Sequence, residues 1–101
     1  MTVYGGSFFD DWGVKRIHFV GIGGVGTSGI AELLHTMGFE VSGSDLEETE
    51  ITQRLARLGI KVSIGHNPAN VQDKDLIVYS TAVKEDNPEL IKARELHIPC
   101  I

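Results

Sequence analysis

The residues best suited to chemistry form a glycine-rich run, GIGGVG at positions 21–26, which satisfies the pattern G-x-G-x-x-G. The run lies between an apolar stretch at 17–20 and a segment with helical spacing. In that context, backbone N–H groups at the helix start bind phosphates. A sharp turn alone would not need four glycines in six residues. The run therefore predicts a diphosphate site in which backbone donors, rather than cationic side chains, meet the negative charge.

A carboxylate follows at the spacing typical of nucleotide-binding domains. Asp45 lies 19 residues after Gly26, just beyond a second predicted strand, where such a group commonly accepts hydrogen bonds from a ribose. The alternative is that Asp45 caps the helix that follows. NAD and UDP both offer a diphosphate and ribose hydroxyls, so position and chemistry leave the ligand open between them.

The elements that must position these residues alternate between strand and helix. Strands are expected at 15–20, 39–43, 61–64 and 76–79, with a further strand beginning at 98–101. Helices are expected from the glycine run to Gly38, at 51–58 and from Asn87. In the last of these, Pro88 is the first helical residue and Glu89 a carboxylate near the helix dipole. The sequence predicts an α/β, Rossmann-like domain of three layers, with a parallel sheet of about five strands and helices on both faces.

Bulk properties narrow the class of protein. A chain of 101 residues, 42% of them hydrophobic, can bury one modest core, so a single domain is expected over 14–101. Residues 1–13 have no strand or helix period and are interpreted as a flexible leader or as residues added for expression. The charge, 9 − 14 = −5, disfavours nucleic acid and anionic membranes as partners. A cytoplasmic protein is expected, because the sequence has no bilayer-spanning run, no signal peptide and a single cysteine, Cys100. The spacing of the histidines suggests no metal site.

Several blocks of sequence are similar to one protein family. They are HFVGIGGVGTSGIAE at 18–32, SGSD at 42–45, GH at 65–66 and STAVKEDNPE at 80–89. In this order and spacing they resemble the opening of the UDP-N-acetylmuramate:L-alanine ligases of the Mur ligase family, over nearly all of 15–101. Thr27 departs from the family pattern, in which methionine is more usual. The related ligases that recycle murein tripeptide are less similar, because their loop contains fewer glycines.

The resemblance implies roles for individual residues. The phosphate-binding amides would be those of Gly23, Gly24, Val25, Gly26, Thr27 and Ser28, which would hold the diphosphate of UDP-N-acetylmuramate. Asp45 would bind the ribose or uracil side, and the His66 imidazole would stack on the uridine or donate to it. Ser80 and Thr81 end the predicted central strand, beside the crevice where ligands of parallel sheets bind. Each of these side chains also has a structural interpretation. Ser28 would be an ordinary hydroxyl of the first helical turn, His66 a histidine of a surface loop, and Ser80 and Thr81 hydroxyls that satisfy backbone groups at the strand end.

The resemblance further implies an ATP-dependent ligase that adds L-alanine to UDP-N-acetylmuramate in peptidoglycan synthesis, in the cytoplasm. Phosphoryl transfer requires a phosphate loop and Mg²⁺, and the chain contains neither G-x-x-x-x-G-K-[ST] nor any Gly-Lys pair. We therefore expect no catalytic residue and no cofactor in this domain. ATP and Mg²⁺ would act in a central domain, and a C-terminal domain would bind the amino acid, both outside this chain. The alternatives are an NAD-binding domain of an oxidoreductase and a non-catalytic nucleotide-sensing module.

Overall fold

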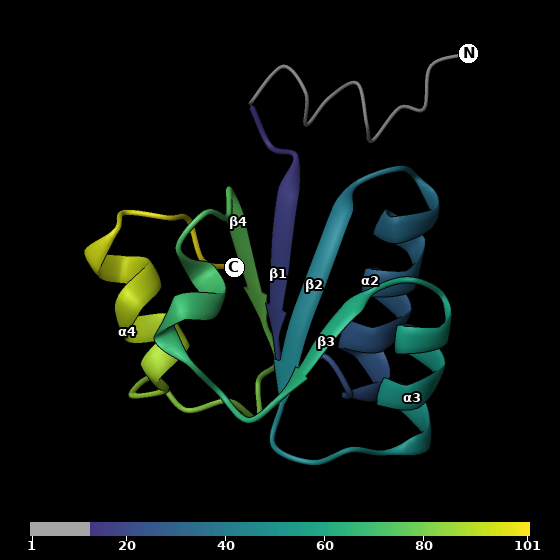
Figure 1. The fold of residues 1–101 in the computed structure, drawn as a ribbon. Helices are drawn as coiled ribbons and strands as arrows, with labels where there is room; N and C mark the ends of the chain where they lie inside the picture. The colour runs from purple at the N-terminus through teal and green to yellow at the C-terminus, as the bar shows by residue number, and fades with distance from the viewer. Residues whose placement is uncertain (1–12) are drawn as a thin grey trace.

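Parallel strands and the helices between them make up residues 13–101, the part of the chain that the computed structural model describes (Figure 1). The strands are β1 (Arg16–Val20), β2 (Glu40–Asp45), β3 (Lys61–Ile64) and β4 (Leu76–Tyr79). The helices are α2 (Val25–Thr36), α3 (Glu50–Arg57), α4 (Pro88–Glu95) and a short 3-10 helix, η1 (Pro68–Val71). The predicted strands and helices up to α4 are confirmed, and η1 is additional. The suggested leader lies outside the described residues, apart from Gly13.

The strand order explains where a ligand can bind. The order is β3-β2-β1-β4, and every neighbouring pair is parallel. The prediction that the strand at 76–79 is central is wrong, because β4 is the last strand in this order. The chain moves outward from β1 to β3 and then crosses back, which creates a switch point between β1 and β4. Ligands of open parallel sheets bind beyond the carboxyl ends of the strands at such a point. The glycine run at 21–26 leaves the sheet there, directly after Val20.

The predicted fifth strand is reduced to a single bridge. Cys100 pairs in parallel with Ile77 of β4. The Ile77 N–H donates to the Pro99 carbonyl, and the Ile101 N–H donates to the Ile77 carbonyl, both at 2.9 Å. The sheet therefore has four strands, one fewer than predicted, and residues 98–101 contribute only this bridge.

Helices cover both faces of the sheet, as predicted, with α2 and α3 on one face and α4 and η1 on the other (Figure 1). The sequence of β1 accounts for this arrangement, because successive residues of a strand point to opposite faces. Ile17 and Phe19 join the core beneath α2 and α3, and Val20 joins the core beneath α4. His18 shares the face of Val20 and is only 1% exposed. A polar side chain is therefore buried in the middle of the sheet.

The apolar spacing in α2 predicted the helix correctly but does not mark its buried face. The helix ends before Gly38, whose φ of 101° is that of the predicted left-handed cap. Leu34 packs against the core and Ala31 is fully buried, whereas Val25 and Leu33 are 85% and 58% exposed. The helix therefore contacts the sheet mainly through small and partly buried side chains.

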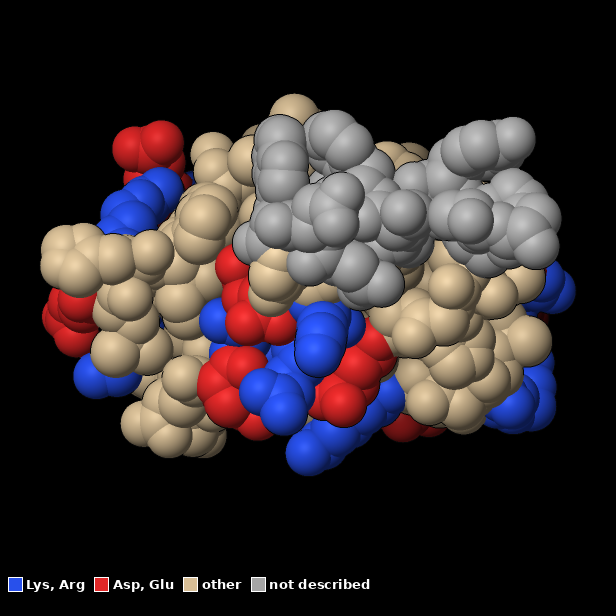
Figure 2. All heavy atoms as spheres, turned by 90° about the horizontal axis from the view of Figure 1, so that it is seen from above, with Lys and Arg blue, Asp and Glu red and all other residues tan. Residues whose placement is uncertain are grey.

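The N-terminal ends of the strands, opposite the switch point, carry charges of both signs (Figure 2). Basic and acidic side chains lie next to one another on this face. Arg16 Nε, for example, lies 3.6 Å from Glu40 Oε2. The face in view is therefore not dominated by one sign of charge. Within residues 13–101, no helix has the length and apolar character that crossing a bilayer requires.

Candidate functional site

A cleft of about 660 Å³ lies beyond the carboxyl ends of β1, β2 and β4. Five of the predicted site residues line it, although they come from separate segments of the chain: Gly23, Gly24, Asp45, His66 and Ser80. The other five predicted residues do not line it: Val25, Gly26, Thr27, Ser28 and Thr81. The structure thus gathers the carboxylate, the imidazole and one hydroxyl around the first half of the glycine run.

The glycine run is anchored to the sheet by its own backbone. The N–H groups of Gly21 and Ile22 both donate to the Ser44 carbonyl, at 2.9 and 3.0 Å. Gly21 has a φ of 82°, which favours glycine at this sharp turn. The Thr27 hydroxyl donates to the Gly21 carbonyl at 2.8 Å and lies 3.2 Å from the Gly24 carbonyl. The side chain of Thr27 therefore holds the loop rather than facing the cleft.

Three backbone donors at the start of α2 have no acceptor within the described part of the chain. They are the N–H groups of Val25, Gly26 and Thr27, because the first helical hydrogen bond runs from the Ser28 N–H to the Gly24 carbonyl at 2.8 Å. Free N–H groups at a helix start, together with the helix dipole, attract anions. This first turn follows directly from Gly24 in the cleft and can receive a phosphate group.

The remaining amides of the predicted phosphate cradle already have partners. The Gly24 N–H donates to the Gly21 carbonyl at 3.2 Å, and the Ser28 N–H is part of the helix. The Ser28 hydroxyl donates to the Val25 carbonyl at 3.1 Å. The free donors are thus fewer than the six that the sequence suggested.

Asp45 ties the glycine run to the end of β2. Its Oδ2 accepts the Gly23 N–H at 2.7 Å, and its Oδ1 accepts the Leu46 N–H at 2.8 Å. A Cβ at Gly23 would lie 2.8 Å from Oδ2, so this close approach requires glycine. The alternative interpretation of Asp45 as a helix cap is wrong, because the N-cap of α3 is Thr49, whose hydroxyl accepts the Thr52 N–H. Asp45 instead shapes the loop and borders the cleft.

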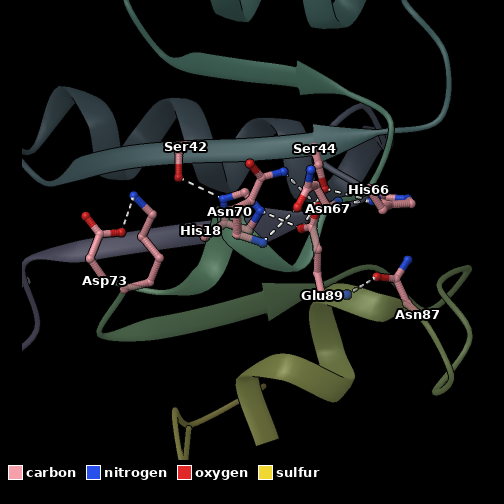
Figure 3. Close-up of polar contacts among 11 residues, drawn as sticks. His18, Ser42, Ser44, His66, Asn67, Asn70, Asp73, Asn87 and Glu89 are labelled. Carbon is pink, nitrogen blue, oxygen red and sulfur yellow. Dashed lines mark hydrogen bonds and ion pairs between the residues drawn. The ribbon is translucent and has the colours of Figure 1, made fainter. Parts of the chain in front are cut away.

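His66 reaches the cleft from the end of β3 and is supported from behind by buried polar groups (Figure 3). Its side chain is 11% exposed, and its Nδ1 lies 2.8 Å from the hydroxyl oxygen of Ser44. The Ser44 hydroxyl donates in turn to Oε1 of Glu89 at 2.8 Å. The surface-loop interpretation of His66 is therefore incomplete, because the ring is held in place from the protein interior.

Glu89 is the centre of this buried network and has no exposed surface. Besides Ser44, its carboxylate receives His18 Nε2 at 2.7 Å, the Asn67 N–H at 2.9 Å and the Asn70 side-chain amide at 3.0 Å. Burial raises the pKa of Glu89, but the hydrogen bonds from His18, Asn67 and Asn70 outweigh it and hold the pKa at about 2. Glu89 is therefore an ionised carboxylate at neutral pH.

The sequence interpretation missed this network. It treated Glu89 as a carboxylate near a helix dipole and gave His18 little weight, although both are buried and bonded to each other. A usable signal was present, since a histidine inside an otherwise apolar strand requires a polar partner. His18 Nδ1 also lies 2.8 Å from the Ser42 hydroxyl. The spacing of the residues gave no indication of which partner His18 would find.

The strand-end hydroxyls are placed differently from each other. Ser80 lines the cleft and its hydroxyl accepts the Ala82 N–H at 3.2 Å, while Thr81 is exposed and does not line the cleft. The Ser80 hydroxyl therefore satisfies a backbone group at the strand end, as the structural interpretation holds, but its hydrogen is still available to a ligand.

The charged side chains of the cleft include one that the sequence interpretation did not assign. Lys84 lines the cleft together with the carboxylates of Asp45, Glu47 and Asp86. Within residues 13–101, no group of three or more His, Cys, Asp or Glu side chains is arranged to hold a metal ion. An anion in this cleft would therefore have Lys84 as its cationic partner, with the free N–H groups at the start of α2 following directly after Gly24 and the three carboxylates opposing it.

Known proteins share both the sequence and the fold of this chain. The sequence model of the Mur ligase family, catalytic domain, matches residues 16–101. The chain is 56% identical over 88 residues to a UDP-N-acetylmuramate--L-alanine ligase of Pelobacter propionicus and 61% identical over 88 residues to one of a Janthinobacterium species. Each alignment covers 87% of this chain and 19% of the relative. The chain thus spans about a fifth of the length of these curated relatives.

Two solved structures are similar in fold. The UDP-N-acetylmuramate-alanine ligase of Thermotoga maritima superposes with a TM-score of 0.81 at 45% identity, over 84% of this chain and 20% of that chain. The UDP-N-acetylmuramate:L-alanyl-gamma-D-glutamyl-meso-diaminopimelate ligase of Neisseria meningitides superposes with a TM-score of 0.78 at 32% identity, over 87% of this chain and 28% of that chain. The family match, the sequence relatives and these folds agree, and the chain belongs to the Mur ligase family.

Proposed function

We propose that this chain binds the uridine diphosphate part of UDP-N-acetylmuramate, as the N-terminal domain of an ATP-dependent ligase that adds L-alanine to that substrate in peptidoglycan synthesis. One observation carries the proposal: free N–H groups at the start of α2 adjoin a cleft that also contains Asp45 and His66. The cleft volume of about 660 Å³ lies within the usual range for small-molecule sites. The relatives named above make UDP-N-acetylmuramate the preferred nucleotide.

The diphosphate would lie at the first turn of α2. The amides of Val25, Gly26 and Thr27 have no other acceptor in the described residues, and the helix dipole favours negative charge there. Lys84 lines the same cleft and would add one positive charge. This supports the sequence-based hypothesis that backbone donors carry most of the negative charge, with a single side chain assisting them.

The uridine would lie toward His66, Asp45 and Ser80. Asp45 already accepts two backbone N–H groups, and each carboxylate oxygen has a second lone pair with which to accept a ribose hydroxyl. The sugar end would then extend past the switch point. In the intact protein, which we propose to be cytoplasmic, the central domain would supply ATP and Mg²⁺ to activate the carboxylate of the substrate, and the C-terminal domain would bind L-alanine.

An NAD-binding domain presents many of the same features, and the test must separate the two ligands. Backbone amide NMR spectra of the 101-residue chain would be recorded during titration with UDP-N-acetylmuramate, with UDP and with NAD. We expect both uridine nucleotides, and not NAD, to shift the signals of Val25, Gly26 and Thr27. Shifts produced by NAD alone would contradict the proposal, and equal shifts from all three would leave only a general diphosphate site.

A further inference from the structure

The Ser44 hydroxyl lies between two groups, and only one arrangement of its proton satisfies both. Its oxygen is 2.8 Å from Glu89 Oε1 and 2.8 Å from His66 Nδ1. A hydroxyl donates a single hydrogen bond, and an ionised carboxylate can only accept. Ser44 therefore donates to Glu89 and must accept a proton from His66. The Nδ1 atom of His66 carries a hydrogen.

The charge state of Glu89 follows from its surroundings. His18 Nε2 and the Ser44 hydroxyl converge on Oε1, while the Asn67 N–H and the Asn70 amide converge on Oε2. The two groups at Oε2 can only donate, so a proton on Glu89 could lie only at Oε1, between His18 Nε2 and the Ser44 hydroxyl. The low pKa of Glu89 agrees with this geometry.

The position of the proton on His66 decides what the cleft offers to a ligand. A neutral imidazole has one N–H and one bare nitrogen, and with Nδ1 protonated the bare nitrogen is Nε2. The His66 ring lines the cleft, and its Nε2 has no hydrogen-bond partner within residues 13–101. Figure 3 shows the ring lying at the end of the network, beyond Ser44. The cleft therefore presents an acceptor here.

We propose that Glu89 and Ser44 are positioning residues that hold His66 in the Nδ1–H tautomer, so that Nε2 accepts a hydrogen bond from an N–H or O–H group of the bound nucleoside. This inference rests on the proposed function. It replaces the expectation that His66 donates to the uridine, because a neutral His66 has no proton at Nε2 to donate. The donor on the ligand is the uracil N3–H or a ribose hydroxyl.

Two other histidines in the chain provide internal references. His35 Nε2 lies 2.8 Å from the Leu58 carbonyl, which can only accept, so this ring carries its proton at Nε2. His18 Nε2 faces the Glu89 carboxylate and carries its proton there for the same reason. His66 is thus the opposite tautomer to both, in the same molecule and under the same conditions.

The tautomers can be read directly from two-bond ¹H–¹⁵N NMR spectra of the ligand-free chain at about pH 8, above the ordinary pKa of histidine. We expect the bare nitrogen of His66 to be Nε2 and that of His35 and His18 to be Nδ1. A proton at Nε2 of His66 would overturn the inference. This measurement needs neither a ligand nor a variant.

Replacing the carboxylate tests whether Glu89 sets the tautomer. In Glu89→Gln the amide oxygen satisfies the Asn67 and Asn70 donors, and the NH₂ group then points at His18 and Ser44. Ser44 can then accept from that NH₂ group and donate its own hydrogen to His66 Nδ1, so the Nδ1–H tautomer is no longer required and the proton of His66 is expected at Nε2. We expect this change in Glu89→Gln and not in the control Glu32→Gln, a partly exposed carboxylate that pairs with Arg54 at 2.9 Å. A folded Glu89→Gln chain that keeps Nδ1–H would refute the role of Glu89.

Binding experiments then identify the ligand group. UDP is expected to shift the His66 Nε2 resonance, and an analogue that lacks the donating group, 3-methyl-UDP, 2′-deoxy-UDP or 3′-deoxy-UDP, should bind roughly tenfold more weakly than UDP. Equal affinities for all four, with Nε2 unshifted, would overturn the acceptor role. A failure of UDP to bind, with the tautomer as expected, would overturn the proposed function and the ligand contact but not the connection from Glu89 to His66.

Discussion

Acidification is expected to remove a defined part of the stability of this domain through Glu89. The ordinary pKa of this side chain is 4.5, and the hydrogen bonds of the folded state lower it to about 2. Because the folded-state pKa is the lower one, the stabilisation is fully present above about pH 5 and disappears as the pH falls toward 2. The lowering of the Glu89 pKa from 4.5 to about 2 corresponds to about 3 kcal/mol of unfolding free energy, of which about 2 kcal/mol is lost by about pH 3.

The measurement compares urea unfolding of the wild-type chain with that of Glu89→Gln at about pH 6 and at about pH 3. The chain has 14 acidic residues, so the absolute loss of stability contains several contributions. The difference between the two proteins isolates one of them. We expect the wild type to lose about 2 kcal/mol more than Glu89→Gln over this range. The control Glu32→Gln, in which a partly exposed carboxylate is removed, should lose nearly as much as the wild type.

Equal losses in the wild type and in Glu89→Gln would refute the reasoning. The variant is expected to be less stable throughout, because removing the charge from a buried pair costs about 3–5 kcal/mol. If it does not fold, the carboxyl ¹³C resonance of Glu89 in the wild type decides the matter. A titration midpoint near 4.5 instead of near 2 would show that the four donors do not hold the carboxylate ionised.

Three further substitutions, two of them with a matched control, test the glycine loop and the cleft. Gly23→Ala places a Cβ 2.8 Å from a carboxylate oxygen and should lower the free energy of unfolding, measured in urea, by about 1–3 kcal/mol. The control Gly29→Ala, with open space around the new Cβ, should raise it by up to about 1 kcal/mol. The reverse order of stability would contradict the loop geometry. Thr27→Val removes the hydroxyl that donates to the loop carbonyls, so the free energy of unfolding should fall by about 1–2 kcal/mol. An unchanged value would mean that this hydroxyl does not stabilise the loop. Lys84→Met should weaken UDP binding about fivefold, measured by calorimetry, and the control Lys92→Met, outside the cleft, should leave it unchanged. Equal affinities of the wild type and Lys84→Met would show that Lys84 does not contact the ligand.

Local signals in the sequence were sufficient for most of the fold. Asn87 and Pro88 marked the start of α4, and the structure confirms the Asn87 side chain as its cap. The same pair of residue types, Asn67 and Pro68, begins η1, with Asn67 as its cap. The helix η1 was not predicted, although the Asn-Pro signal is the same, because the helix is only four residues long and ends at Val71, shortly before β4.

The candidate site was predictable only as far as its local part. The glycine run acts over six adjacent positions, and its strand, turn and helix were read correctly. The supporting contacts are long-range: His18 and Glu89 are 71 residues apart, and Asp45 and Gly23 are 22 apart. Local propensity carries no information about such pairs. The exposure of Val25 could not be read from the sequence for a related reason, since apolar periodicity identifies a helix but not which of its residues other elements cover.

The buried network also determines how one negative charge near the site, that of Glu89, acts on a ligand. An unpaired carboxylate near a diphosphate would repel it. The charge of Glu89 is instead distributed over four hydrogen bonds, and one of these leads through Ser44 to His66. A carboxylate behind a histidine N–H makes the opposite ring nitrogen a better acceptor. The negative charge that would oppose the phosphates therefore strengthens the contact with the nucleoside, and its removal should weaken UDP binding even where the geometry of His66 is preserved.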